Sequence, residues 1–423
     1  MVAALTHLFG VHNLALAEDV VQDAFCRALE VWPFRGVPEN PAAWLMAAAK
    51  HRAIDVLRRE RTARTFAPEL GRLLESEWTL RPAVEEIFGA ASVKDDLLRM
   101  MFSCCHPRLS EDAQVALVLH LLCGFGVGEV AAAFLSTEAA TRKRITRAKN
   151  VLAASKRIFD LADSGFDARL TSVQRVLYLL FNEGYHGTSA GSAVRAELCS
   201  EALRLTMLLV EHPPASTPAT HALAALMCFH AARLPARVNA AGDLSSLFDQ
   251  DRSQWDAELI AQGRALLDRS ATGLEVTEYH LEAAIAAVHA SAGRAEETDW
   301  GQIVSLYDTL LTIRPSPVVA LNRAIAVAEH EGAARGLEEI HALRRRERLT
   351  SYPFYFAALG ELELRCNRLD QAREHFHAAL ALARNAMERR FLEQRLGACE
   401  AGGPSIAAPT NPPASPSHPD RRD

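Results

Sequence analysis

Hydrophobic residues recur every three or four positions along most of the chain, which is the spacing of one face of an α-helix. Alternating patterns typical of β-strands are nearly absent, and runs of Val, Ile, Thr and Tyr between turn residues are few. We therefore predict an all-α protein. The segment 401–423 is different, because it holds six prolines among Ala, Ser and Asn and has little apolar surface to bury. We predict that it is a disordered tail.

Two amphipathic helices are predicted near the N-terminus. The first covers residues 14–32, and opposite its apolar side it has a polar, mostly acidic face formed by Glu18, Asp19, Gln22 and Asp23. The second begins at Asn40-Pro41, an N-cap followed by a proline at the first helical position. Its later turns carry the cations Lys50, Arg52, Arg58, Arg59 and Arg61. Such a basic stripe is typical of nucleic-acid binding, although a solvated helix face gives the same pattern.

A second basic segment follows at residues 110–155. One helix closes at the glycines of CGFGVG, a short helix covers about 128–134, and a turn leads into a longer helix. The longer helix and its extension hold seven basic residues, with no acidic residue between Glu138 and Asp160. This order predicts a helix-turn-helix, in which the second helix lies in the major groove of DNA.

The distribution of charge supports this division. The chain of 423 residues has 46 basic and 52 acidic side chains, a net charge of −6 that by itself argues against binding to phosphates. Residues 1–160, however, hold 20 basic and 19 acidic side chains, and the remainder holds 26 and 33. The acidic excess therefore belongs to the C-terminal part.

The eight cysteines follow no disulfide-scaffold spacing. No basic segment opens the chain, and the longest apolar run, residues 115–127, is too short to span a bilayer. We expect reduced thiols, a cytoplasmic location and no contact with a membrane. Cys104-Cys105-His106 and Cys123 are residue types that bind zinc, but no CxxC pair accompanies them, and we predict no metal site.

The C-terminal half is predicted to consist of paired helices. Residues 356–384 fit the 34-residue tetratricopeptide pattern, with Leu359-Gly360 as its Leu-Gly pair, Ala372 and Ala379 at small positions and Phe376 at the aromatic one. Helix pairs of this kind stack on their neighbours. We predict an α-solenoid whose concave groove binds a protein or a small-molecule ligand.

Two polar clusters raise the alternative of an enzyme. In Asn182-Glu183-Gly184-Tyr185-His186 a Glu near a His could act as a general base, and in Asp249-Gln250-Asp251-Arg252 two carboxylates could bind a cation. Helix termination at Gly184 and a salt-bridged corner explain the same residues. Because neither cluster completes a catalytic motif, and no nucleotide or phosphate fingerprint is present, we expect no enzymatic activity and no cofactor.

Several motifs resemble those of a known family. LALAEDVVQDAFCRALEVWPF followed by NPAAWLMAAAKHRAIDVLRRE resembles region 2 of bacterial RNA polymerase sigma factors of the extracytoplasmic-function type, and EVAAAFLSTEAATRKRITRAK resembles their region 4 helix-turn-helix. FSCCHPRLS, VLYLLFNEGY, FDQDRSQW, HLEAAIAAVHA and SPVVALNRAIAVAE resemble the subgroup with a C-terminal tetratricopeptide-like extension. The resemblance covers about residues 2–400. It implies a subunit that brings core RNA polymerase to promoter DNA and is regulated by its C-terminal repeats.

The resemblance also implies a division into domains: region 2 at 1–64, a linker at 65–92, region 4 at 93–160, a family-specific helical domain at 168–290 and tetratricopeptide-like repeats at 291–400. Relatives usually have a longer first helix before VAAL, so we expect a shortened region 2 and a reduced affinity for the polymerase. The alternative is a tetratricopeptide-type scaffold whose sigma-like helices no longer engage polymerase.

Site residues are carried over from the same resemblance. The acidic face Glu18, Asp19, Gln22 and Asp23 matches the surface that docks on the polymerase. The residues that match the elements opening and holding the −10 element are Trp44, Lys50, Arg52, Arg58 and Arg59. Those expected to read the −35 element are Thr137, Thr141, Arg142, Lys143 and Arg144, with Arg147 and Lys149 on phosphates.

Overall fold

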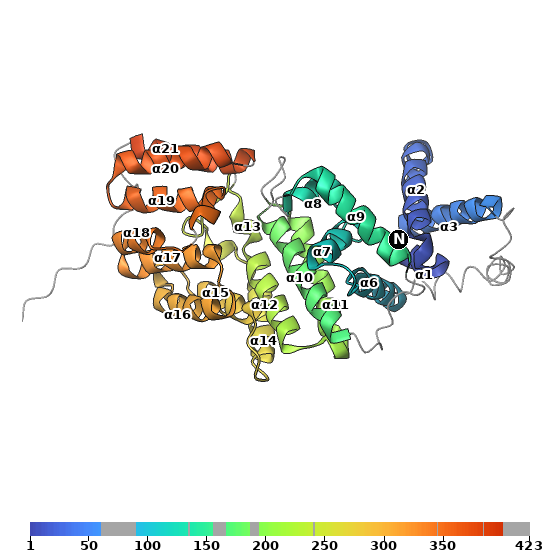
Figure 1. The fold of residues 1–423 in the computed structure, drawn as a ribbon, viewed down its shortest axis with the longest axis horizontal. Helices are drawn as coiled ribbons and strands as arrows, with labels where there is room; N and C mark the ends of the chain where they lie inside the picture. Colours follow the sequence, from blue (N-terminus) through green and yellow to red (C-terminus); the bar gives the residue numbers. More distant parts are fainter. Residues whose placement is uncertain are drawn as a thin grey trace, which may run out of the picture. The chain divides into compact units, whose positions relative to one another are not determined.

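The computed structural model is helical (Figure 1) and describes residues 1–60, 90–133, 136–154, 166–186, 194–239, 242–344, 346–383 and 385–400. Within these ranges there is no β-strand, and an isolated bridge joins Val238 to Leu244. The all-α prediction is confirmed. The predicted tail at 401–423 and most of the predicted linker, up to residue 89, lie outside the described residues.

The chain forms two compact units. The first contains the described residues up to Ala231 together with Ala265–Gly273, and the second contains Ala232–Arg264 and the described residues from Leu274 onward. The helices up to residue 232 are α1 (Val2–Phe9), α2 (Leu14–Arg35), α3 (Pro41–Glu60), α6 (Ala90–Cys104), α7 (Glu111–Leu121), α8 (Val127–Ala133), α9 (Glu138–Ala153), α10 (Phe166–Tyr185), α11 (Ala196–Glu211) and α12 (Pro218–Ala232). Those that follow are α13 (Leu234–Arg237), α14 (Ala257–Ser270), α15 (Glu278–Ser291), α16 (Trp300–Ile313), α17 (Pro317–Glu331), α18 (Ala333–His341), α19 (Pro353–Arg365), α20 (Leu369–Leu382) and α21 (Ala386–Glu400).

A seam of small residues holds α1, α2 and α3 together. Its buried members include Ala17, Val20, Ala24, Ala28, Ala49 and Ala53, joined by Leu5 and Leu45. Alanines at three- and four-residue spacing let two helices approach closely. The third of these helices starts as the sequence predicts, because the Asn40 side chain accepts a hydrogen bond from the Ala43 amide at 3.0 Å.

The predicted boundary at residue 168 lies inside the first compact unit. Helix α10 packs against α6 and α7 in the first unit, and Figure 1 shows it beside α7. The Phe166 ring stacks on Phe102 of α6 with 4.7 Å between centroids. The first helices of the predicted family-specific domain therefore share a core with the segment that precedes them.

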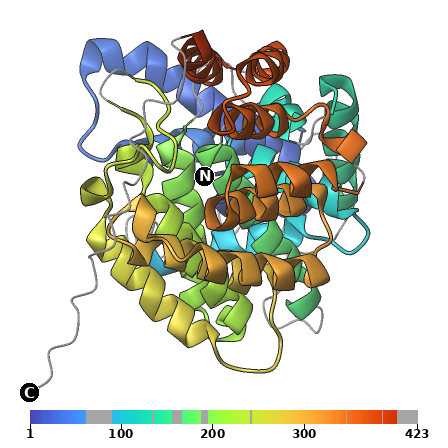
Figure 2. The same cartoon turned by 90° about the vertical axis from the view of Figure 1, so that its left-hand side faces the viewer.

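In the second unit, α16 to α21 form successive antiparallel pairs. They lie one above another in Figure 2, from the orange helices near residue 300 to the red ones near residue 400. The positions matched to the tetratricopeptide pattern in α19 and α20, namely Leu359, Ala372, Phe376 and Ala379, are all buried. A methyl group at Gly360 would lie 2.9 Å from atoms of the Phe376 ring, which explains why a glycine stands there.

Gly336 in α18 gives a test of this packing. A Cβ atom at this position would overlap the Ala328 Cβ of α17, so we expect Gly336→Ala to lower the free energy of unfolding by about 1–3 kcal/mol. Gly397 in α21 is the matched control, because nothing lies within 4 Å of the place where a Cβ atom would stand. Gly397→Ala should be neutral or stabilise by about 0.5–1 kcal/mol. Urea unfolding followed by circular dichroism measures both; equal stability of the two variants would contradict the packing.

Candidate nucleic-acid interface

Helices α8 and α9 follow one another with stabilised N-termini. Glu129 in the first turn of α8 accepts a hydrogen bond from the Gly126 amide at 2.8 Å. Thr137 is the N-cap of α9, and its hydroxyl accepts from the Ala140 amide at 3.3 Å. The sequence-predicted role of Thr137 at a base edge thus falls on an exposed capping residue at the start of the basic helix.

One face of α9 packs inward through Thr141, Ile145, Ala148 and Leu152, which are all buried. Thr141 has no exposed surface, and its hydroxyl lies 2.7 Å from that of Ser136. This corrects the prediction that Thr141 reads DNA, because a buried side chain on the inward face of α9 cannot reach a base edge. Its hydrogen bond instead fixes the turn before α9.

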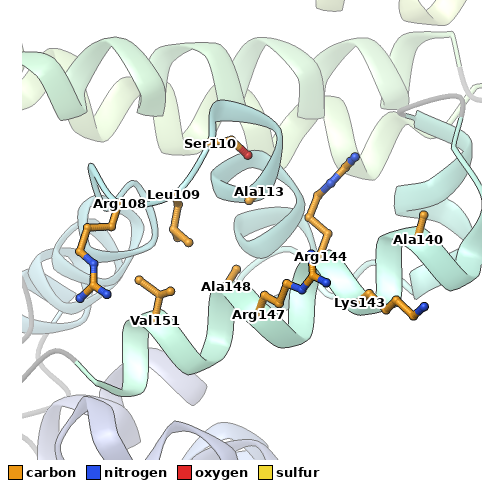
Figure 3. Close-up of a pocket in the computed structure, with 10 residues that line it drawn as sticks. All are labelled: Arg108, Leu109, Ser110, Ala113, Ala140, Lys143, Arg144, Arg147, Ala148 and Val151. Carbon is orange, nitrogen blue, oxygen red and sulfur yellow. The ribbon is translucent and has the colours of Figure 1, made fainter.

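The outer face of α9 borders a groove (Figure 3). One wall comes from α9, and the other comes from the end of the α6–α7 turn and the start of α7. Four cationic side chains, Arg108, Lys143, Arg144 and Arg147, line the groove together with small and apolar residues, and no carboxylate is among the lining residues. A concave surface lined by one sign of charge attracts the opposite charge. The groove therefore suits an anion such as a backbone phosphate.

Of the cations predicted on α9, Arg142, Lys143 and Arg147 are exposed and Arg144 is partly buried. Arg108 is an addition that the sequence analysis missed. It stands 34 residues before Arg142, in a turn after α6, and only the packing of α7 on α9 brings it to the same groove. The adjacent Pro107 marks a turn, but nothing local in the sequence pairs that turn with α9.

The basic stripe of α3 is partly engaged in other contacts. Trp44 packs on the core of the first three helices, with its ring edge-on to Trp32 at 5.5 Å. Lys50 is partly buried, and this burial lowers its pKa. Arg52 is exposed, and its hydrogen bond to Asp23 raises its pKa. Arg58 and Arg59 belong to the last turn of α3, and their side chains lie outside the described residues.

Two ion pairs join the predicted polymerase surface to the predicted DNA surface. Lys149 of α9 donates to Glu18 of α2 at 2.7 Å, with about a quarter of each side chain exposed. Arg52 of α3 donates to Asp23 of α2 at 2.8 Å. Asp19 and Gln22 are exposed. The four residues of the acidic face therefore divide into two that bind other helices of the unit and two that face solvent.

An apolar stripe on α2 was not predicted as a surface. Phe25, Leu29 and Phe34 are 49%, 77% and 89% exposed, and Val37 just after the helix is 65% exposed. Phe25 and Leu29 stand three and seven residues after Gln22, on the same face of the helix. Exposed apolar side chains on one helix face, here Phe25 and Leu29, are typical of surfaces that bind other proteins. The sequence signal was this spacing, which continues the polar face and not the buried one.

Residues of two other clusters considered in the sequence are buried or hydrogen-bonded within the fold. Burial raises the pKa of the Cys105 and Cys123 thiols to about 12, which disfavours the thiolate that zinc requires.

Asp251 caps the short 3-10 helix Arg252–Gln254. Arg252 donates to the carbonyls of His289 and Ala292 at the end of α15, and its guanidinium lies 5.0 Å from the Trp255 ring. Among the described residues, no group of three His, Cys, Asp or Glu side chains could hold a metal ion.

Comparison with known proteins gives two family matches. Residues 2–63 match Sigma-70 region 2, and residues 169–271 match a Family of unknown function (DUF6596). No solved structure matches the chain. None of the described helices combines the length and apolarity that crossing a membrane requires.

A full-length relative is also known. An uncharacterized protein of Rhizobium meliloti (strain 1021) is 40% identical over 385 residues, which cover 91% of this chain and 90% of that protein. The first 63 residues of the present chain thus carry a sigma-70 region 2 domain, which implies binding to core RNA polymerase and DNA in general. The chain is therefore a sigma-factor-like protein and belongs to the same family as this Rhizobium meliloti protein.

Proposed function

We propose that the protein is a sigma factor of the extracytoplasmic-function type, which directs core RNA polymerase to promoters and acts in the cytoplasm. The observation that carries this proposal is the cationic groove beside α9, in the same compact unit as a sigma-70 region 2 domain. The protein binds, positions and opens DNA, and the polymerase performs the chemistry. Neither the Glu183 nor the Asp251 cluster is assigned a reaction.

In this proposal α8 and α9 are the helix-turn-helix of region 4. An α-helix fits the major groove, and its N-terminal residues reach base edges. Arg142 and Lys143, in the second turn of α9, would read the −35 element. Arg144, Arg147 and Arg108 border the groove, where they would hold phosphates of the DNA backbone.

Region 2 would act on the −10 element through α3. Unpaired bases need an aromatic or apolar surface beside cations that hold the backbone. Trp44, Lys50 and Arg52 supply these residue types along α3, and Arg58 and Arg59 follow in its last turn. Because Trp44 already packs on Trp32, its contribution would come from the part of the ring that remains exposed.

The polymerase would bind the outer face of α2. This face combines the exposed polar residues Asp19 and Gln22 with the apolar side chains of Phe25 and Leu29. A buried apolar centre beside polar residues is the usual composition of a protein interface. The C-terminal helix pairs would be tetratricopeptide-like repeats that regulate this activity and hold a protein or small-molecule ligand in their groove.

Run-off transcription tests the proposal. Purified core polymerase, the full chain and the DNA upstream of its own gene should give a discrete transcript that depends on this protein. If no transcript appears and the chain does not bind core polymerase at all, the chain acts as a scaffold and the sigma-factor proposal is wrong.

Substitutions on α9 should separate sequence reading from phosphate binding. Arg147→Ala removes one phosphate contact, so it should weaken binding to all duplexes and reduce the slope of log affinity against log salt by about 1. Arg142→Ala should cost about 1–3 kcal/mol on the cognate duplex and little on others. Arg346→Ala, which removes an exposed cation from the second unit, is the control. Fluorescence anisotropy at several salt concentrations measures these effects; identical behaviour of all three variants would remove α9 from the DNA surface.

The apolar stripe of α2 is tested by adding a charge. Leu29 is 77% exposed, so Leu29→Asp should leave the stability of the free protein unchanged within about 0.5 kcal/mol. Its binding to core polymerase should fall at least about 10-fold, because a carboxylate would be buried without a partner. Leu274→Asp is the matched control, since Leu274 is fully exposed in a loop far along the chain. Equal polymerase affinity of both variants, measured by biolayer interferometry, would place the interface elsewhere.

A further inference from the structure

Arginines at the start of the segment that matches the family of unknown function contact α6, α7 and α8. Arg169 of α10 donates to the Phe102 carbonyl at the end of α6 at 3.1 Å, and Arg175 forms an ion pair with Glu111 at the start of α7. Arg195, directly before α11, forms an ion pair with Glu129 of α8 at 2.6 Å. Three arginines from one segment thus reach three successive helices of another.

From these contacts we infer that α10 and α11 hold the proposed helix-turn-helix in position, with Arg195 as the positioning residue for α8. This inference rests on the proposed function for its effect on DNA, but the mechanical role can be measured separately. The start of the segment that matches the family of unknown function would then support DNA binding by holding α8 in place, without touching DNA itself.

Arg195 acts on α8 through a carboxylate that has two roles. One oxygen of Glu129 accepts from the Gly126 amide and stabilises the start of α8, and the other oxygen accepts from Arg195. The guanidinium also lies over the buried Phe125 ring, 5.2 Å from its centroid. About 23% of the Arg195 side chain is exposed, so the pair is only partly screened by solvent. The same arginine therefore fixes both the capping residue of α8 and the loop before it.

A glycine makes this approach possible. Near the end of α10, the carbonyl of Gly184 accepts a hydrogen bond from the Arg195 amide at 2.7 Å. A Cβ atom on Gly184 would lie 2.8 Å from the Cys199 amide nitrogen and 2.9 Å from the Arg195 carbonyl oxygen. Any side chain at residue 184 would push the start of α11 away, and Arg195 with it. The cluster at 182–186 thus acquires a role in helix packing.

The position of α9 depends on the ion pair between Arg195 and Glu129 indirectly, through α8. Helix α8 packs on both α7 and α9, and the turn between α8 and α9 is fixed by the Ser136 and Thr141 hydroxyls. When Arg195 is substituted, α8 loses its ion pair to the residue before α11 and is held only by its packing and its chain connections. The orientation of α9 then becomes less restricted, and DNA binding must supply the ordering cost.

Hydrogen exchange on the full chain tests the mechanical role. Arg195→Gln should speed amide exchange in peptides covering 126–133 and 138–153 by about 5- to 10-fold, the combined effect of a partly exposed ion pair and a cation–π contact. Arg204→Gln is the matched control. Arg204 pairs with Glu201 of its own helix at 2.7 Å, and its loss should leave α8 and α9 unchanged.

A double-mutant cycle isolates the pair. Glu129→Gln keeps an oxygen for the Gly126 amide but removes the negative charge, so it should speed exchange in α8 to a similar degree. The double variant should exchange no faster than the faster single variant. Additive effects in the double variant, or equal exchange in the Arg195 and Arg204 variants, would overturn the inference. Should Arg195→Gln unfold the protein, unchanged exchange in α8 of the Glu129→Gln variant overturns it equally.

The salt dependence of DNA binding is a second readout. It distinguishes a positioning role from a direct contact with a phosphate. Arg195→Gln should weaken duplex binding about 3- to 10-fold with an unchanged salt slope, whereas Arg147→Ala lowers that slope. A reduced slope for Arg195→Gln would mean that Arg195 touches DNA itself and would contradict a positioning role. If the wild-type chain binds no duplex, the proposed function fails, while the exchange experiment still decides the mechanical role.

Discussion

The first compact unit depends on the burial of α7. Eight of its eleven residues are buried, on every side of the helix, among them Val115, Leu117 and Leu119. A helix that is apolar all round is stable only when neighbours cover all of it. Helices α8 and α9 cover one part of α7, and α6 and α10 cover the rest. The segment that holds α8 and α9 and the segment that begins with α10 therefore meet in one core, with α7 between them.

This arrangement explains why cations collect on one face of α9. The inner face is fixed against α7, so Arg142, Lys143 and Arg147 can lie only outward. Arg175 of α10 and Arg195, directly before α11, meanwhile form ion pairs with Glu111 and Glu129, neither of which lines the groove. These two carboxylates are thereby paired away from the groove, and a chain with a net charge of −6 can still present a cationic surface.

Local patterns in the sequence predicted the helices and several of their ends correctly. The Asn40 cap and the buried tetratricopeptide-pattern positions Leu359 and Phe376 follow from spacing within one helix or one helix pair. Such features depend on residues close in the sequence, so a single chain is enough to find them. The polymerase and DNA surfaces were assigned by resemblance, and their roles remain predictions.

What could not be predicted depends on contacts between distant segments. Lys149 and Glu18 are 131 residues apart, and no local pattern pairs them. Thr141 was predicted to contact DNA because it stands near the start of a basic helix. Its hydroxyl instead forms a hydrogen bond with that of Ser136. Arg108 joins the groove only through the packing of α7 on α9. In each case the neighbour that decides the role comes from another helix.

The ion pair between Glu18 and Lys149 has a consequence for how the two proposed surfaces communicate. A ligand that takes Glu18 releases Lys149, and a ligand that takes Lys149 releases Glu18. Thermodynamic reciprocity then requires each to raise the affinity of the other by the same factor. For a partly exposed pair the coupling free energy is about 1 kcal/mol or less, roughly fivefold in affinity, and it falls as salt screens the charges. A single contact between α2 and α9 thus makes binding at one surface a modest, salt-sensitive regulator of binding at the other.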